Sequence, residues 1–178
     1  MSQNETAIKI MDIAERMARV GGYHAFSFRE IAAEIGIKSA SVHYHFANKE
    51  TLGAAIADRY TQRFMAAIGA PDDATPDVML NRYVQVYRGA QLEDELMCLC
   101  GMFGAEIRYL PASVAAKTRD FFRQNLAWLT AVYTRQGDDA HTAAKNAETL
   151  IATLEGAMIL SHSMDDPEVF QNITQDLT

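Results

Sequence analysis

Residues 27–52 read SFREIAAEIGIKSASVHYHFANKETL, and this stretch predicts a helix, a tight turn and a second short helix. Ser27 and Glu30 have the spacing of a capping box, which marks the start of a helix. Apolar residues then recur at helical spacing as far as Gly36, the residue type best suited to a left-handed turn. The stretch therefore predicts two helices joined by a turn at Gly36.

The second helix of this stretch has an inner and an outer face. Val42 and Phe46 are placed inward, and the step of about 100° per residue then defines the outer residues. The outer residues are Ala40, Ser41, His43 and Tyr44. No carboxylate lies on this outer face, and the preceding helix can brace it crosswise. An exposed face of this kind is what insertion into the major groove of DNA requires.

The same residues resemble a known family signature. The run GIKSASVHYHF from Gly36 to Phe46, followed by Asn48-Lys49-Glu50 and Leu52, is similar to the signature of the tetracycline-repressor (TetR) family of bacterial regulators. The resemblance covers residues 6–56. It implies an all-α, homodimeric repressor in which an N-terminal three-helix helix-turn-helix domain is joined by a bridging helix to a helical body for ligand binding and dimerisation. It also implies a double-stranded DNA operator of palindromic form and a small-molecule inducer as partners.

We expect a DNA-binding domain over residues 1–50 and a ligand-binding and dimerisation domain over residues 51–178. The DNA-binding candidates are Ser41, His43 and Tyr44 for base or phosphate contact, Lys38, Ser39 and His45 for positioning on the DNA backbone, Lys49 for a phosphate as the resemblance suggests, and Ser27 and Ala40. The sequence departs from the common family pattern at Lys38, where a serine cap is frequent, and at His43, where tyrosine is frequent. These departures put the individual contacts in question but not the module.

The charge of the chain is divided unevenly. The 178 residues carry a formal net charge of -7, yet residues 1–50 hold six basic and six acidic side chains, so the acidity belongs to the body. A neutral DNA-binding module has weak non-specific attraction to phosphates, and binding should therefore depend on dimerisation. No apolar run is long enough to cross a bilayer, and the first residues lack the features of a secretory signal. We expect a cytoplasmic protein that does not enter a membrane.

Helical periodicity continues through the body. The expected helices run from Asn48 to Ile68, from Thr75 to about residue 88, from Glu95 to Leu110, from Ser113 to Arg135, and from Asp138 or Asp139 to Ser161. Residues from Asp165 onward are expected to form a short, frayed tail. The last two long helices are the predicted dimer interface, where Ala147, Gly156 and Ala157 would let a partner helix approach closely. The alternative is that these helices pack only within one chain.

The body also contains the residue types that line small-molecule pockets. Aromatic and flexible side chains recur in the helices between residues 83 and 128, although a residue of each of these types is more often ordinary core. Glu106 could orient a polar ligand, or could face solvent or an ion-pair partner. The ligand-binding candidates are Tyr83, Tyr87, Cys98, Met102, Phe103, Glu106 and Trp128, and Met97 and Tyr109 are further lining residues.

Three other functions would each explain part of the sequence. A thiol-based electrophile or redox sensor within the same family would use Cys98 or Cys100, but acidic residues 93–95 just upstream would disfavour a thiolate, and buried, reduced cysteines are the simpler expectation. A helical enzyme acting on a small apolar substrate would need a nucleophile motif, a metal pair or a phosphate loop, and none is visible. A purely structural dimerisation module would leave the exposed outer face unexplained. The sequence therefore predicts a regulator that is not an enzyme and that needs neither a cofactor nor a metal.

Overall fold

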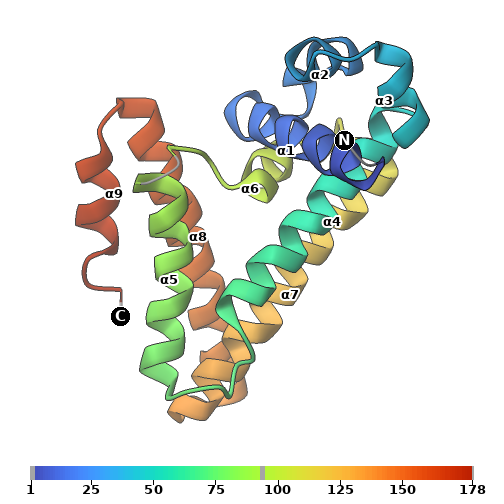
Figure 1. The fold of residues 1–178 in the computed structure, drawn as a ribbon. Helices are drawn as coiled ribbons and strands as arrows, with labels where there is room; N and C mark the ends of the chain where they lie inside the picture. The colour runs from blue at the N-terminus through green and yellow to red at the C-terminus, as the bar shows by residue number, and fades with distance from the viewer. Residues whose placement is uncertain (1–2, 93–94, 178) are drawn as a thin grey trace. The chain divides into compact units, whose positions relative to one another are not determined.

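The computed structural model of the protein describes residues 3–92 and 95–177, and all regular secondary structure within these ranges is helical (Figure 1). The prediction of an all-α fold is confirmed. The helices are α1 (Gln3–Gly21), the 3-10 helix η1 (Tyr23–Ala25), α2 (Phe28–Ile35), α3 (Ser39–His45), α4 (Lys49–Ile68), α5 (Pro76–Leu92), α6 (Leu99–Ala105), α7 (Ala112–Gln136), α8 (Ala140–Met164) and α9 (Pro167–Thr174).

The chain forms two compact units. The first unit holds residues 1–61 and 99–121, and the second holds residues 62–98 and 122–178. Two of the three boundaries fall inside long helices, α4 and α7, and the third lies just before α6. Consequently α6 and the first part of α7 belong to the same unit as the N-terminal helices. The predicted domain boundary after residue 50 does not coincide with this division, and it stays a prediction about which segments fold independently.

The first unit is built on an apolar core shared by α1, α2, α3 and the start of α4. Ile10, Ile31, Val42 and Ile56 are fully buried, each on the inward face of its own helix. Burial of one such side chain stabilises a fold by about 1.5–3 kcal/mol. Together they hold α2 and α3 against α1, which is the arrangement that the N-terminal sequence pattern predicts (Figure 1).

The second unit packs α5, α8 and α9 side by side (Figure 1). The start of α5 is where the Thr75-Pro76 pair predicts it, since Pro76 is the first helical residue and the Thr75 carbonyl accepts from the Met79 amide at 3.0 Å. Asp139 caps α8 by accepting from the backbone amides of His141 and Thr142, both at 2.9 Å. The caps predicted from the sequence therefore do form in this unit.

The prediction of a frayed C-terminal tail is wrong. Asp166 accepts from the Glu168 amide at 2.9 Å and Pro167 takes the first helical position, so α9 has a well-defined start. Phe170 and Thr174 are fully buried, and Arg88 of α5 donates to the Thr174 carbonyl at 2.8 Å. The tail is thus a packed helix, because the capping signal was followed by an apolar side chain that α5 and α8 cover.

The expected helix from Glu95 to Leu110 is also shorter than predicted, since α6 covers only Leu99–Ala105. Beyond Ala105 the chain forms turns, in which the Tyr109 amide donates to the Glu106 carbonyl at 2.8 Å. The Glu106 side chain accepts a hydrogen bond from the backbone amide of Tyr23. Tyr109 was expected to line the interior, but its side chain is 83% exposed because it lies on this turn.

Candidate functional site

The first helix of the candidate DNA-binding pair, α2, is closed at both ends by local contacts. The Ser27 hydroxyl donates to the Glu30 carboxylate at 2.6 Å and accepts from the Glu30 amide at 3.3 Å. Gly36 ends the helix in the left-handed region at φ 78°, where its amide and that of Ile37 both donate to the Ala32 carbonyl. Glycine adopts this conformation without steric cost because it has no Cβ atom. The turn between the two helices is therefore fixed where the sequence predicts it.

The second helix, α3, is anchored through two apolar residues. Val42 is fully buried and Phe46 is nearly so, as predicted. The opposite side of the helix is turned to solvent: Ala40, His43 and Tyr44 are exposed, while the other predicted residues at 39, 41 and 45 are half-buried. Lys38 occupies the N-cap position without a capping side-chain bond, and it is exposed. No Asp or Glu occurs within α3, so this surface repels no phosphate by direct charge.

Aromatic contacts orient the exposed rings. The His43 ring meets Phe28 of α2 edge-on with the ring centroids 4.7 Å apart, and the Tyr44 and His45 rings meet edge-on at 5.3 Å. These contacts limit the rotamers of His43 and Tyr44 before any ligand arrives. A side chain that is ordered in the unbound protein loses less conformational entropy on binding.

A hollow of about 440 Å³ lies beside α3, lined by Lys38, Ala40, Ser41, Tyr44 and His45 together with two other residues. One of these, Thr6, comes from the first turn of α1, and it was not among the candidates predicted from the sequence. The sequence pattern around α3 could not predict Thr6, because Thr6 belongs to α1 and comes close to α3 only in the folded chain. The hollow shows that α1 contributes to the surface that α3 presents.

Lys49 has a different environment from the other candidates. Its ammonium lies over the Tyr23 and Phe26 rings, 4.7 Å and 4.6 Å from their centroids, and the residue is half-buried. Burial lowers the pKa of Lys49, while Glu30 and Glu106 act against this shift. The cation–π contacts fix the ammonium near the start of α4, where Asn48 caps the helix by accepting from Thr51 at 2.8 Å. Contact of Lys49 with a phosphate remains a prediction.

Glu106, a predicted ligand contact, instead joins two segments of the first unit. Its carboxylate accepts from the Tyr23 backbone amide at 2.9 Å and lies against Gly22, where an added Cβ atom would overlap Glu106 Oε1. Phe103 of α6 packs on the Tyr23 ring with centroids 6.0 Å apart and is fully buried, and Met102 is half-buried. These contacts attach α6 to the segment that leads into α2.

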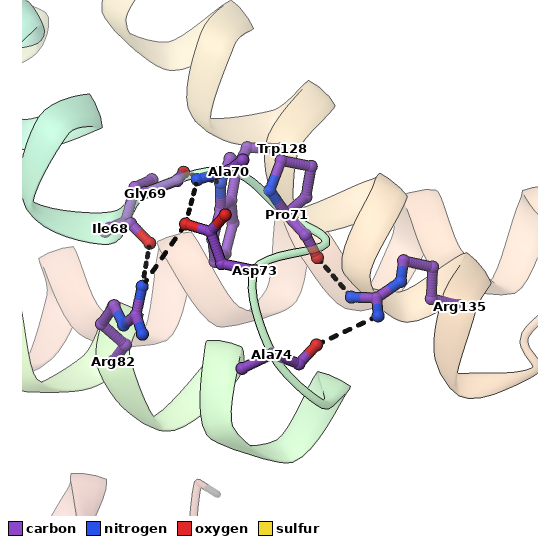
Figure 2. Close-up of polar contacts among 9 residues, drawn as sticks. All are labelled: Ile68, Gly69, Ala70, Pro71, Asp73, Ala74, Arg82, Trp128 and Arg135. Atoms are coloured by element: carbon purple, nitrogen blue, oxygen red, sulfur yellow. Dashed lines mark hydrogen bonds and ion pairs between the residues drawn. The ribbon is translucent and has the colours of Figure 1, made fainter.

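The remaining ligand candidates belong to the second unit. Tyr83 stacks on Trp128 with centroids 5.7 Å apart and donates to Asn125 at 2.9 Å. The Trp128 indole N–H donates to the Gly69 carbonyl at 2.8 Å, in a loop that Arg82 and Arg135 also hold through carbonyl groups (Figure 2). Trp128 thus fixes the α4–α5 connection. The structure divides the seven candidates between its two units, so they do not form a single cluster within either unit.

Tyr87 and Cys98 meet a buried carboxyl group in the second unit. Tyr87 donates to Glu155 Oε1 at 3.0 Å, while Glu155 Oε2 has no hydrogen-bond partner and no solvent contact. Burial raises the pKa of Glu155, and hydrogen bonds from Cys98 and Tyr87 oppose this shift. Cys98 and Cys100 are buried and form no disulfide, and Cys98 is one of the groups that hydrogen-bond Glu155. Glu93 and Asp94, which were predicted to disfavour a thiolate at Cys98, lie outside the described residues.

The family model for bacterial regulatory proteins of the tetR family matches residues 10–56, which contain α2 and α3. An HTH-type transcriptional regulator of Xanthobacter autotrophicus, from the dhlA 5′ region, is 23% identical over 100% of this chain and 89% of its own length. Within residues 3–92 and 95–177, no helix combines the length and the apolar character that crossing a membrane would require.

Solved structures show the same fold over nearly the whole chain. The crystal structure of a TetR-family transcriptional regulator from Agrobacterium tumefaciens is 32% identical, covers 98% of this chain and 96% of its own, and superposes with a TM-score of 0.90. A TetR transcriptional regulator from Legionella pneumophila is 28% identical, with coverage of 95% and 93% and a TM-score of 0.88. The similarity therefore includes the helical body as well as the N-terminal helices.

Proposed function

Because the chain belongs to the TetR family of helix-turn-helix transcriptional regulators, which are not enzymes, we propose that it is a cytoplasmic homodimeric repressor that binds a palindromic operator and leaves it when a small-molecule inducer binds. The observation that carries the DNA-binding part is the outer face of α3, where His43 and Tyr44 are exposed on a helix without acidic residues. A helix in this setting fits the major groove, with base contacts specifying the sequence and phosphate contacts setting the register.

We assign the roles on this face from exposure. Tyr44 and His43, the exposed ring side chains of α3, are the proposed base contacts, and Ser41, which lines the hollow, is the third. Lys38, at the exposed N-cap, supplies the positive charge closest to the start of α3. The residues proposed to position the protein on the DNA backbone are Ser27, Lys38, Ser39, Ala40, His45 and Lys49.

The homodimer is proposed to form through α7 and α8. Ile159, Leu160 and Met164 are half to two-thirds exposed on α8, and a side chain added at Gly156 on this helix would meet nothing within 4 Å. Ala147 and Ala157, which were expected to face a partner, are buried within their own unit. The partner helix would therefore pack over Gly156 and the three large apolar side chains.

Substitution Leu160→Glu tests this surface. A charge placed in the centre of an apolar helix interface should raise the dimer dissociation constant at least about 100-fold, since an unpaired buried charge costs about 3–5 kcal/mol. Sedimentation velocity over a dilution series measures the effect, and Glu148→Gln on the same helix is the control. A Leu160→Glu chain that stays dimeric at the same concentrations as wild type would contradict the proposed interface.

The inducer is proposed to act on the body of the protein. The buried and unpartnered Glu155 Oε2 beside Tyr87 supports a polar ligand contact there, because buried polar atoms in native proteins are nearly always bonded. Ligand binding would then tilt α4, whose first residue is Lys49, and change the spacing of the two α3 helices. Half-sites on DNA lie about one helical turn or a multiple apart, so a small change prevents simultaneous contact.

The experiment is selection of binding sequences from random duplexes with purified wild-type protein, followed by measurement of affinity and stoichiometry. We expect inverted repeats and two chains for each pair of half-sites. A compound that releases the DNA must bind the DNA-free protein more tightly by the same factor by which it weakens operator binding. Selection that enriches no sequence, or one chain on an asymmetric site, would contradict the proposal.

A further inference from the structure

A second concave site lies in the second unit, where α5 and α8 end and α9 begins. It encloses about 220 Å³, which is smaller than the usual pocket for a drug-sized ligand. Its walls include the polar residues Gln91, Glu95, Ser161, His162, Asp165 and Asp166. None of these residues belongs to the DNA-binding face or to the predicted ligand contacts.

Gln91 lines this site and carries one unsatisfied amide atom. Gln91 is 5% exposed, its Nε2 donates to the Ser161 hydroxyl at 3.0 Å, and its Oε1 has no partner. The orientation of the amide is determined, because the Ser161 hydroxyl donates its only proton to the Asp166 carbonyl at 2.9 Å and must therefore accept from Gln91. Gln91 Oε1 is thus a buried acceptor that lacks a donor.

The charges around this acceptor are negative. Glu95, Asp165 and Asp166 supply three carboxylates, and no ion pair joins any of them to a basic side chain in the described part of the chain. One Asp166 oxygen is used to cap α9, which leaves the other. Two helix C-terminal ends, those of α5 and α8, also lie here and carry partial negative charge, against one N-terminal end of partial positive charge, that of α9. His162 is the one basic side chain among the wall residues named above.

We propose that this site binds a small organic cation, an ammonium or guanidinium group whose N–H donors reach Gln91 Oε1 and the carboxylates. Donors are required because the unsatisfied atom is an acceptor, and positive charge is required because the surrounding groups are anionic. An organic cation is favoured over a metal ion, since among residues 3–92 and 95–177 no three His, Cys, Asp or Glu side chains are placed so that they could hold one metal ion. This proposal does not depend on whether the protein binds the proposed operator or forms the proposed dimer.

The probe is agmatine, which carries an ammonium and a guanidinium group, and the neutral comparison is 1,4-butanediol. Binding to the full-length protein is measured by isothermal titration calorimetry at low ionic strength. We expect saturable binding of agmatine at one site for each chain, weakening as salt is added, and no binding of the diol.

The charge-removing variant is Asp165→Asn together with Glu95→Gln. Asp165 has φ 50°, a conformation that Asn also tolerates, so the end of α8 should keep its shape. Loss of two partly exposed charge pairs should weaken agmatine binding about tenfold. The control pairs Glu148→Gln with Asp176→Asn, which removes the same net charge from exposed positions outside the site and should leave binding nearly unchanged.

A third variant, Gln91→Met, tests the acceptor at constant net charge. It should weaken agmatine binding at least about threefold while circular dichroism shows the same helix content as wild type. Absence of saturable binding to the wild-type chain would overturn the proposal. Equal weakening in the two charge-removing variants would also overturn it, because the attraction would then come from the net charge of the chain rather than from this site.

Discussion

The α2–α3 pair and the α5–α8 pair hold polar side chains in opposite ways. On α3 the polar side chains of His43 and Tyr44 face solvent, and both ends of α2 are fixed by contacts between residues three to five positions apart. On α5 the residues Tyr83, Tyr87 and Gln91, spaced by one helical turn, turn inward and bond to Asn125, Glu155 and Ser161. The partners of these inward groups lie 42 to 70 residues away in the chain.

The exposed face of α3 is therefore suited to binding DNA, whereas the buried polar groups of the second unit are suited to a change of conformation. A surface whose shape comes from short-range contacts can be presented unchanged to DNA. Buried polar groups with unsatisfied atoms, such as Glu155 Oε2 and Gln91 Oε1, hold the second unit in an arrangement that protonation or a ligand can alter. We expect substitutions in the second unit to change stability more than substitutions at the short-range contacts of the first.

The largest effect is expected at Phe170 of α9. Phe170→Ala removes a fully buried ring from the second unit and should lower the free energy of unfolding by about 3–5 kcal/mol. Urea denaturation followed by circular dichroism measures this, with Gln171→Ala at an exposed position as the control. A loss below about 1 kcal/mol would mean that α9 is not packed, and the second unit would then resemble the first in depending on local contacts.

A pH-dependent effect of intermediate size is expected at Glu155. Because burial raises the pKa of this carboxyl, the folded state favours its neutral form, and this contribution to stability is lost as the pH rises through the folded pKa. Glu155→Gln stays neutral, so it should gain stability relative to wild type as the pH rises above the ordinary value for glutamate. The gain is about 1.4 kcal/mol for each pH unit by which the pKa is raised.

Unfolding free energies of wild type and Glu155→Gln at several values between pH 4 and pH 8 provide the measurement. Glu148→Gln, which also removes one carboxyl group from α8, is the matched control. A constant difference between wild type and Glu155→Gln across this range would show that folding does not raise the pKa of Glu155.

The smallest effect is expected at Ser27. Ser27→Ala removes the N-cap of α2 and should lower the free energy of unfolding by about 1 kcal/mol, because the hydroxyl satisfies the Glu30 amide. Ser163→Ala, at an exposed position in α8, should change it by less than about 0.5 kcal/mol. An effect of Ser27→Ala as large as that of Phe170→Ala would remove the distinction between the two units.

The same distinction explains how much the sequence could predict. The cap at Ser27, the left-handed turn at Gly36 and the inward pair Val42 and Phe46 depend on neighbours within one or two helical turns, and all were predicted. The family and the all-α fold followed from them. Thr6, which joins α3 only through the packing of α1, carries no local signal of its position.

The errors in the body have physical causes of the same kind. The apolar pattern from Glu95 to Leu110 indicates that the segment is buried, but it does not determine where the helix ends. The helix ends at Ala105, and beyond it the chain forms turns in which Glu106 bonds to the Tyr23 amide. The tail beyond Asp165 lacked a long apolar stripe, and its stability comes from one ring and from Arg88 of a helix far away in the sequence. Trp128 was predicted to line a pocket because aromatic residues often do. In the structure its indole N–H donates to a loop carbonyl, that of Gly69.

The most direct test of the central claim, that the outer face of α3 reads DNA, compares two exposed tyrosines. Tyr44 is 70% exposed on α3 and Tyr109 is 83% exposed on the turn after α6, and both belong to the first unit. The measurement is fluorescence anisotropy with the selected operator duplex for Tyr44→Ala and Tyr109→Ala. Loss of a base contact worth about 1–3 kcal/mol should weaken Tyr44→Ala about 5- to 150-fold, with Tyr109→Ala unchanged. Equal operator affinities for Tyr44→Ala and wild type would contradict the account.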